Sequence, residues 1–214
     1  LHKKLEQAKA SNSIPKVVIP VHFSGEPCDM RSIKKLSDEF GFKILEDASH
    51  AIGGRYNETP IGASVYSDIT VFSFHPVKII TSGEGGAALT NSKFLDQKMK
   101  LLRSHGVTRD QNMMETPSDN IWYYEQVDLG FNYRMTDIHA ALGLSQLERL
   151  EEYIRLRHQI AEIYDEHFLN ADVIKPFRNK INLSAMHLYV IQVDEKKHGE
   201  VFNNLRQLNV GVNL

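Results

Sequence analysis

Two runs of strand-forming residues constrain the fold of this chain most, because each run ends in a turn that carries reactive side chains. Residues 69–74 are mostly β-branched and aromatic and predict a buried strand, and Lys78 lies in the turn that follows. Residues 42–45 predict a second strand, which ends in a segment that contains Asp47 and His50. If the two strands are parallel, these side chains open on one edge of the sheet, where α/β proteins place ligands.

Strands and helices alternate along much of the chain, which favours an α/β fold. Residues 16–22 predict a buried strand, and apolar residues recur at helical spacing from Met30 to Phe40, with Gly41 suited to the position after a helix. A strand, a helix and a strand in this order predict a right-handed crossover unit. Further elements are expected as the end of a helix at residues 2–10, a strand at 86–90, a helix at 93–104 with Phe94, Met99 and Leu102 inward, one long helix from Thr136 toward Phe168, a strand at 187–193 and a short helix at 201–208.

Residues 107–128 interrupt this pattern as a long excursion. They contain a cluster of Trp122, Tyr123 and Tyr124. Such a cluster more often serves packing, but on a surface loop it also fits a segment that reaches across a dimer interface.

Composition and charge exclude several classes of partner. The 25 basic and 27 acidic residues are spread along the chain, and the formal net charge of -2 leaves no basic stripe for nucleic acid or an anionic membrane. No apolar run approaches the roughly 20 residues that span a bilayer. Cys28 is the single cysteine, which excludes an internal disulfide framework and fits a reducing cytoplasm.

Lys78 and Asp47 together predict a specific chemistry. A lysine amine condenses with the aldehyde of pyridoxal phosphate, and an aspartate keeps the ring nitrogen of that cofactor protonated, so that the ring withdraws electrons. Lysine alone is weak support, since most of the 25 Lys and Arg residues are expected to be solvated surface charges. The pairing of the two side chains, each beyond a strand, makes a cofactor site a serious alternative to a surface role.

Simpler roles remain open for several of these residues. Asp47 is also suited to cap a helix that starts near Ala48, and His50 and His75 are also suited to structural positions. A metal site made of Asp47, His50 and His75 is disfavoured, because no second ligand pair has the spacing of a zinc site. The glycine-rich residues 82–86 precede a strand rather than a helix, so we expect a tight turn there rather than a phosphate loop.

Five motifs follow one another along the chain. They are Glu46-Asp47-Ala48-Ser49-His50-Ala51, Phe72-Ser73-Phe74-His75-Pro76-Val77-Lys78, Gly83-Glu84-Gly85-Gly86-Ala87-Ala88-Leu89-Thr90-Asn91, Arg103-Ser104-His105-Gly106 and Gly130-Phe131-Asn132-Tyr133-Arg134-Met135. In this order they resemble the pyridoxal-phosphate-dependent nucleotide-sugar aminotransferases of the DegT/DnrJ/EryC1/StrS type. Residues 122–126 and the closing Gly211-Val212-Asn213-Leu214 are most similar to members of this family in pseudaminic acid biosynthesis. The match covers nearly the whole chain.

The resemblance implies the three-layer α/β/α fold of the aspartate-aminotransferase type, fold type I. It implies a large cofactor-binding domain at residues 1–150, incomplete at its N-terminus, and the start of a small domain at residues 151–214. By the same resemblance, Lys78 bonds to the cofactor aldehyde and Asp47 pairs with the ring nitrogen. His50, at a position where most of the family has glutamine, is expected beside the ring and its phenolic oxygen.

Four further residues take roles from the resemblance. Ser73 resembles a hydroxyl that contacts the cofactor phosphate, and Asn132 resembles a phosphate ligand that the other subunit of a homodimer supplies. His75 and Arg134 are expected near the substrate. The active sites would then be shared between the two subunits.

The implied reaction transfers an amino group, from glutamate as the expected donor, to the C4 keto carbon of a UDP-linked 6-deoxy sugar. Two alternatives remain. A sugar dehydratase on the same scaffold replaces the imine-forming lysine by histidine, and Lys78 argues against it. The other is a catalytically silent dimerisation or regulatory module, because family members begin with a longer segment that binds the cofactor phosphate at a helix N-terminus. This chain is therefore expected to be an internal piece of a larger enzyme.

Overall fold

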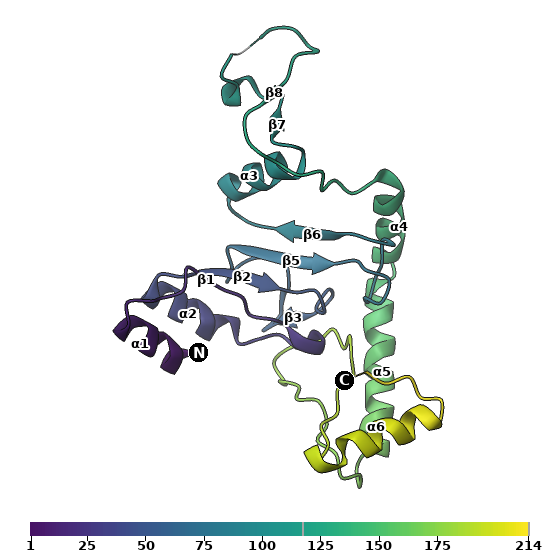
Figure 1. Ribbon diagram of the computed structural model, residues 1–214. Coiled ribbons are helices and arrows are strands. Elements are labelled where there is room, and N and C mark those ends of the chain that lie inside the picture. The colour runs from purple at the N-terminus through teal and green to yellow at the C-terminus, as the bar shows by residue number, and fades with distance from the viewer. Residues whose placement is uncertain (117, 214) are drawn as a thin grey trace.

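The central sheet of the computed structural model holds the two predicted strands side by side (Figure 1). The structure describes residues 1–116 and 118–213, so Leu214, which closes the last motif, lies outside the described residues. Four strands run in the order β1 (Val17–Val18), β2 (Lys43–Asp47), β5 (Ile69–Ser73) and β6 (Gly86–Leu89). β1, β2 and β5 are parallel, whereas β6 pairs with β5 in the antiparallel sense. The parallel pairing that a shared strand edge requires is confirmed.

Helix α2 (Met30–Phe40) forms where the apolar spacing predicts it. At its N-terminus the Asp29 carboxylate accepts a hydrogen bond from the Ser32 N–H at 3.2 Å, and Gly41 follows its C-terminus at φ 80°. Helix α1 (His2–Ala10) packs into the same core cluster through one buried leucine. The buried residues of this cluster are Leu5, Met30, Phe40, Phe42, Ile44 and Tyr56. Each large apolar side chain buried in this way contributes about 1.5–3 kcal/mol to stability.

The other elements surround the sheet. They are η1 (Phe23–Gly25), β3 (Arg55–Tyr56), β4 (Thr59–Pro60), α3 (Lys93–Arg103), β7 (Val107–Thr108), η2 (Gln111–Met113), β8 (Glu125–Gln126), α4 (Asp137–Leu147), α5 (Leu150–His167), η3 (Glu195–Lys197) and α6 (His198–Gln207). Helices α4 and α5 run past the edge of the sheet at which β2 and β5 end (Figure 1). Among the described residues, no helix is both long and apolar enough to cross a membrane.

The predicted long helix from Thr136 to Phe168 is wrong, because the structure has two helices there. α4 ends at Leu147, and Arg149 adopts φ -102° and ψ 5° before α5 begins at Leu150. The predicted strand at residues 16–22 is also shorter, since it consists of β1 and one further bridge between Val21 and Asp47.

Two more predictions needed correction. The predicted strand at residues 187–193 is a single β-bridge in the structure, between Ile174 and Gln192. At the start of this segment the His187 carbonyl accepts a hydrogen bond from Arg157 of α5 instead of from a neighbouring strand. Phe94, predicted to face inward from α3, is 71 % exposed. Phe94 and Leu101 lie on the same side of the helix, but only Leu101 is buried. The chain covers this end of the helix, where the Phe131 backbone N–H donates to the Leu102 carbonyl.

A buried polar network fixes β2 against β5. Glu46 Oε1 lies 2.8 Å from His22 Nε2, and both side chains are almost completely enclosed. The other carboxylate oxygen of Glu46 accepts hydrogen bonds from the hydroxyl groups of Ser67 at 2.6 Å and Thr70 at 3.0 Å. Because successive side chains of a strand point to opposite faces, anchoring Glu46 on one face directs Asp47 to the other.

Residues 107–133, which we call the arm, leave the sheet after α3 (Figure 1). Its two short strands, β7 and β8, pair antiparallel, with Val107 opposite Gln126. Between them the Glu125 carboxylate accepts a hydrogen bond from the Tyr123 hydroxyl at 2.7 Å and one from the Glu115 N–H at 2.7 Å. The long excursion predicted from the sequence is therefore held together mainly by local polar contacts.

Candidate functional site

Asp47 is the last residue of β2 and lies opposite Val71 of β5. Its side chain is half-buried, and Oδ1 accepts a hydrogen bond from the Ser49 N–H at 3.0 Å. Partial burial works to raise the pKa of Asp47, but the bonds from Ser49 and then the interactions with His50, where that ring is protonated, and with the Lys78 amine outweigh it and hold the pKa below its usual value. Asp47 is therefore an ionised carboxylate at the carboxyl edge of the sheet.

Lys78 lies in the turn after β5, and its backbone N–H donates to the His75 carbonyl at 2.9 Å. The next two residues, Ile79 and Ile80, are buried against Ile154 of α5 and therefore anchor the turn. The Lys78 side chain itself is half-buried. Its position fits the prediction that the amine lies near Asp47, because its charge acts on the carboxylate across the edge.

His50 lies in the turn after β2, and a second histidine, His187, packs against it. The two ring centroids are 4.5 Å apart, with the ring planes at 42°. Partial burial, and then the charge of Lys78, lower the pKa of His50. Burial, then repulsion from His50 when that ring is protonated, and then the charges of Lys78 and Arg157 lower the pKa of His187 to about 4. Both rings are therefore neutral at pH 7.

His187 was not among the predicted site residues. It belongs to residues 184–187, which are all buried although they lie outside regular structure. From α5, Arg157 donates to the His187 carbonyl at 3.0 Å, and the ring of His158 lies 2.8 Å from the Ser184 carbonyl. On the opposite side of this segment from α5, the backbone N–H of His187 donates to the Ser24 carbonyl at 2.9 Å. The only sequence signal was a histidine at the start of an apolar run, which predicted a strand.

Ser73 and His75 lie at the same strand end as Lys78. The Ser73 hydroxyl accepts a hydrogen bond from the His75 N–H at 3.4 Å. The His75 ring is exposed, accepts from the Val77 N–H at 3.3 Å and lies 3.9 Å from a carboxylate oxygen of Glu84. These contacts shape the turn and leave the Ser73 side chain half-exposed at the edge.

The glycine-rich segment at residues 82–86 is the tight turn that the sequence predicts. The Phe74 N–H donates to the Gly85 carbonyl at 2.8 Å, and the Ser82 N–H donates to the Phe74 carbonyl at 3.0 Å. Gly85 has φ 147°, and a β-carbon there would lie 2.5 Å from the Met135 side chain. The turn is therefore closed against the segment that leads into α4.

Asn132 and Arg134 come from the base of the arm, and both are exposed. Asn132 pairs with Ser104 in an antiparallel bridge. With Met135, Thr136 and Asp137, the two residues line a shallow hollow. In the described part of the chain, no hydrogen bond joins Asn132 or Arg134 to the residues at the sheet edge. The structure thus brings Asp47, His50 and Lys78 together, whereas Asn132 and Arg134 form no hydrogen bond with them among the described residues.

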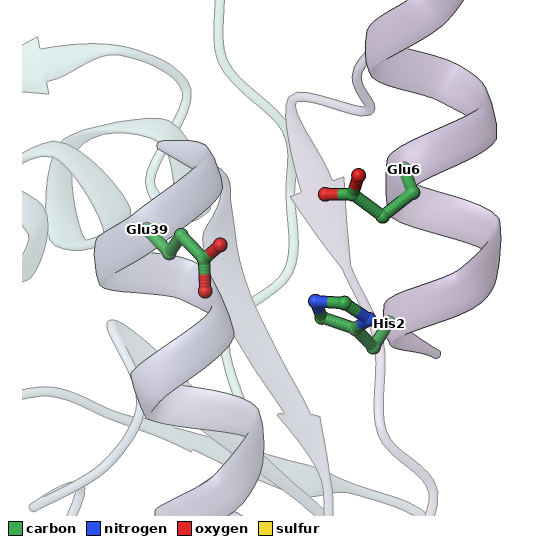
Figure 2. A group of neighbouring side chains, drawn as sticks. All are labelled: His2, Glu6 and Glu39. Atoms are coloured by element: carbon green, nitrogen blue, oxygen red, sulfur yellow. The ribbon is translucent and has the colours of Figure 1, made fainter.

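A separate group of side chains lies on α1 and α2. Figure 2 shows His2 and Glu6 on one helix facing Glu39 on the other. Within residues 1–116 and 118–213, this is the one set of three or more potential metal ligands whose ligand atoms all lie within 4.8 Å of one another. All three side chains are exposed, and exposed carboxylates are common on helices without a metal. We assign no role to this group.

Comparisons with known proteins agree on one family. The model of the DegT/DnrJ/EryC1/StrS aminotransferase family matches residues 2–214. The spore coat polysaccharide biosynthesis protein SpsC of Bacillus subtilis is 38% identical over 217 residues, which cover 99% of this chain and 54% of that protein. The UDP-4-amino-4,6-dideoxy-N-acetyl-beta-L-altrosamine transaminase of Campylobacter jejuni is 34% identical over 221 residues, which cover 99% of this chain and 55% of that protein.

Among solved structures, Helicobacter pylori PseC, an aminotransferase involved in the biosynthesis of pseudoaminic acid, superposes with a TM-score of 0.83 at 32% identity. The match covers 96% of this chain and 53% of that one. The chain thus spans about half the length of the relatives that it matches.

Proposed function

Because this chain belongs to the DegT/DnrJ/EryC1/StrS aminotransferase family, we propose that the protein containing it is a pyridoxal-phosphate-dependent sugar aminotransferase. The proposed reaction moves an amino group, from glutamate, to C4 of a UDP-linked 4-keto-6-deoxy sugar in pseudaminic acid biosynthesis. Support for this substrate class comes from the similarity to the Campylobacter jejuni transaminase and to PseC.

One observation carries the proposal. An ionised carboxylate, Asp47, and a primary amine, Lys78, lie beyond the ends of two adjacent parallel strands. Pyridoxal phosphate, when bound, supplies a ring that withdraws electrons from the carbon next to the transferred amino group. This chemistry needs an anion at the ring nitrogen and an amine at the aldehyde, and the sheet edge offers both groups.

The side chains at the edge fit this cofactor. Only Oδ1 of Asp47 has a hydrogen-bond donor among the described residues, which leaves Oδ2 for a protonated ring nitrogen. Among the described residues no hydrogen bond fixes the His50 ring, whose buried Nδ1 atom has no partner there, so its other nitrogen is available to a ligand. We assign Asp47 to the ring nitrogen, His50 to the face or the phenolic oxygen of the ring, and Ser73 to the phosphate.

The proposed work of Lys78 is covalent binding and proton transfer at Nζ. Its turn is anchored by Ile79 and Ile80, which holds the half-buried amine at the edge. In the full enzyme, Lys78 Nζ would hold the cofactor and would then accept and return a proton during the amino transfer. His75 and Arg134 are assigned to the substrate side.

We also propose that the active enzyme is a homodimer with shared sites. Asn132 is exposed at the base of an arm in which several large apolar side chains, among them Ile121 and Leu129, are exposed as well. A second copy of the chain that covers the arm would bring Asn132 to the phosphate group of the neighbouring site. Apolar surfaces of this kind on one segment are typical of interfaces.

The proposed reaction is tested with the full-length protein, pyridoxal phosphate, L-glutamate and a UDP-linked 4-keto-6-deoxy sugar. We expect 2-oxoglutarate and a UDP-4-amino sugar to form in equal amounts, as measured by mass spectrometry. The Lys78→Ala variant is the inactive control, and Lys100→Ala, an exposed lysine of α3, is the matched active one. A sugar that loses a hydroxyl group instead of gaining an amine would establish the dehydratase, and no turnover of any keto-sugar would favour the silent module.

A further inference from the structure

The paired histidines at the sheet edge have an unusual feature in common. Nδ1 of His50 and Nδ1 of His187 are both enclosed, and neither has a hydrogen-bond partner among the described residues. The rings pack against each other at 4.5 Å, one from the turn after β2 and the other from the buried segment at residues 184–187. Buried polar atoms without a partner are rare in proteins, so a pair of them in contact requires an explanation.

The enclosed Nδ1 atoms decide where the ring protons lie. A neutral imidazole carries one proton, on either Nδ1 or Nε2. A proton on the enclosed Nδ1 would be a buried donor without an acceptor, which is the rarer and costlier kind of unsatisfied group. Within the described residues, the Nε2 atom of neither ring is among the enclosed atoms without a partner. We therefore assign the proton of both rings to Nε2.

The surroundings keep both rings in this neutral state. His187 is 7 % exposed, and the charges that act on it come from Lys78 and from Arg157, whose guanidinium donates to the carbonyl of the same residue. The charges of Lys78 and Arg157 would repel a positive charge on either ring. At neutral pH the edge thus presents two N–H donors beside the Lys78 amine.

We propose that the Nε2–H groups of His50 and His187 together bind one acceptor oxygen of a ligand beside Lys78. This inference rests on the proposed function, and it adds His187 to the binding residues of that site. Two neutral donors and a cation favour an oxygen with full or partial negative charge over an ammonium group. The oxygen belongs either to the cofactor, as its phenolic oxygen, or to the nucleotide sugar, as a keto, hydroxyl or phosphate oxygen.

Two variants of His187 separate ligand binding from packing. In His187→Gln the amide nitrogen reaches about the place of Nε2, whereas in His187→Asn it reaches only about the place of Nδ1. Both variants remove the ring from the contact with His50, so a purely structural role would affect them alike. The measurements on the full-length protein are the Kd of pyridoxal phosphate, the KM of the UDP-sugar, kcat and Tm.

We expect His187→Gln to stay within about threefold of the wild type and His187→Asn to bind about tenfold more weakly or worse, since a hydrogen bond to a charged acceptor is lost. A rise in the Kd of pyridoxal phosphate would assign the oxygen to the cofactor, and a rise in KM alone would assign it to the sugar. Equal losses in both variants, or no loss in either, would overturn the inference.

A second measurement does not depend on turnover. In ¹⁵N-histidine-labelled full-length protein without cofactor, nitrogen chemical shifts distinguish the two tautomers. We expect Nε2–H for both His50 and His187, assigned with the His50→Gln and His187→Gln variants. An Nδ1–H tautomer at either ring would contradict the inference even if the enzyme proves active. Conversely, Nε2–H tautomers in a protein that aminates no sugar would count against the proposed function and remove the ligand assigned here.

Discussion

The sheet edge and the arm differ in the solvent exposure of their apolar side chains. At the edge, Ala48 and Ala51 are completely buried, and Ile80 is 2 % exposed. In the arm, Ile121 is 94 % exposed and Leu129 is 81 % exposed. The edge is thus completed by segments of this chain, including residues that lie far away in the sequence. The arm instead presents apolar surface that only a further chain segment or a second molecule can cover.

Polar groups differ in the same way between the two regions. Glu46 beside the edge and Glu125 in the arm each accept three hydrogen bonds. Glu46 is 4 % exposed and pairs with a buried histidine, whereas the partners of Glu125 are a neighbouring hydroxyl and two N–H groups at the surface. The comparison teaches that contacts within this chain stabilise the edge, whereas the arm leaves large apolar side chains exposed to solvent. The following predictions test this difference.

The largest effect is expected at Asp47. Asp47→Asn removes the anion that we assign to the ring nitrogen, and the loss of one partner of a buried pair costs about 3–5 kcal/mol, or about two to four orders of magnitude in kcat. Cofactor affinity should fall much less. Asp128→Asn, which removes a partly exposed carboxylate of the arm that pairs with Lys98 of α3, should leave kcat nearly unchanged. A near-normal rate for Asp47→Asn in steady-state assays would exclude the role.

Glu46 and Glu125 allow a direct comparison of how much polar contacts stabilise the edge and the arm. Glu46→Ala leaves His22 without its partner in a fully buried position, so the free energy of unfolding should fall by about 3–5 kcal/mol. Glu125→Ala should cause a much smaller loss, because water replaces its partners. Urea unfolding of both variants checks this prediction. Similar losses of unfolding free energy in the two variants would contradict the claim that contacts within the chain stabilise the edge more than the arm.

His187 predicts a loss of stability in acid. Its pKa is about 4 in the folded state and 6.5 when unperturbed, so the unfolded chain binds more protons between these values. Stability is therefore complete above pH 6.5 and falls as the pH drops to 4, by about 3 kcal/mol from this group. His187→Asn should remove that part of the slope of unfolding free energy against pH. An unchanged slope would mean that His187 has the same pKa in the folded protein as in the unfolded chain.

The smallest loss of activity is expected for Asn132 at the base of the arm, and the same residue tests whether two subunits share a site. A hydrogen bond from the Asn132 amide to a phosphate oxygen contributes about 1.5–3 kcal/mol, so Asn132→Ala should impair activity without abolishing it. If Asn132 acts across a dimer, Lys78→Ala and Asn132→Ala protein refolded together should form heterodimers that contain one intact site. Activity should then exceed the sum of the separate variants. Heterodimers isolated with two affinity tags but no gain in activity would rule out sharing.

Most of the sheet edge could be predicted because the relevant residues directly follow strand-forming runs. Asp47 ends such a run and Lys78 lies in the next turn, and parallel pairing necessarily brings these ends to one edge. The α2 boundaries were predictable for a similar local reason, since Asp29 and Gly41 supply the capping interactions. Local chemistry of this kind is visible in the sequence.

Contacts between distant segments could not be predicted in the same way. Residues 187–193 have the composition of a strand, but Arg157 of α5 bonds to the carbonyl of His187 and holds it beside His50. Phe94 has the spacing of a core residue, yet only the far end of its helix is covered. The role that we propose for Asn132 requires a second molecule, and the contacts of one chain do not include it.

The central claim is that Lys78 is the amine that binds the cofactor, and reductive trapping tests it most directly. Full-length protein is incubated with pyridoxal phosphate, treated with sodium borohydride, digested and analysed by mass spectrometry. We predict one phosphopyridoxyl group, on the peptide that contains Lys78, and none in the Lys78→Ala variant, whose fold is checked by circular dichroism. An adduct fixed on another lysine, or one that persists in the folded Lys78→Ala variant, would contradict the account.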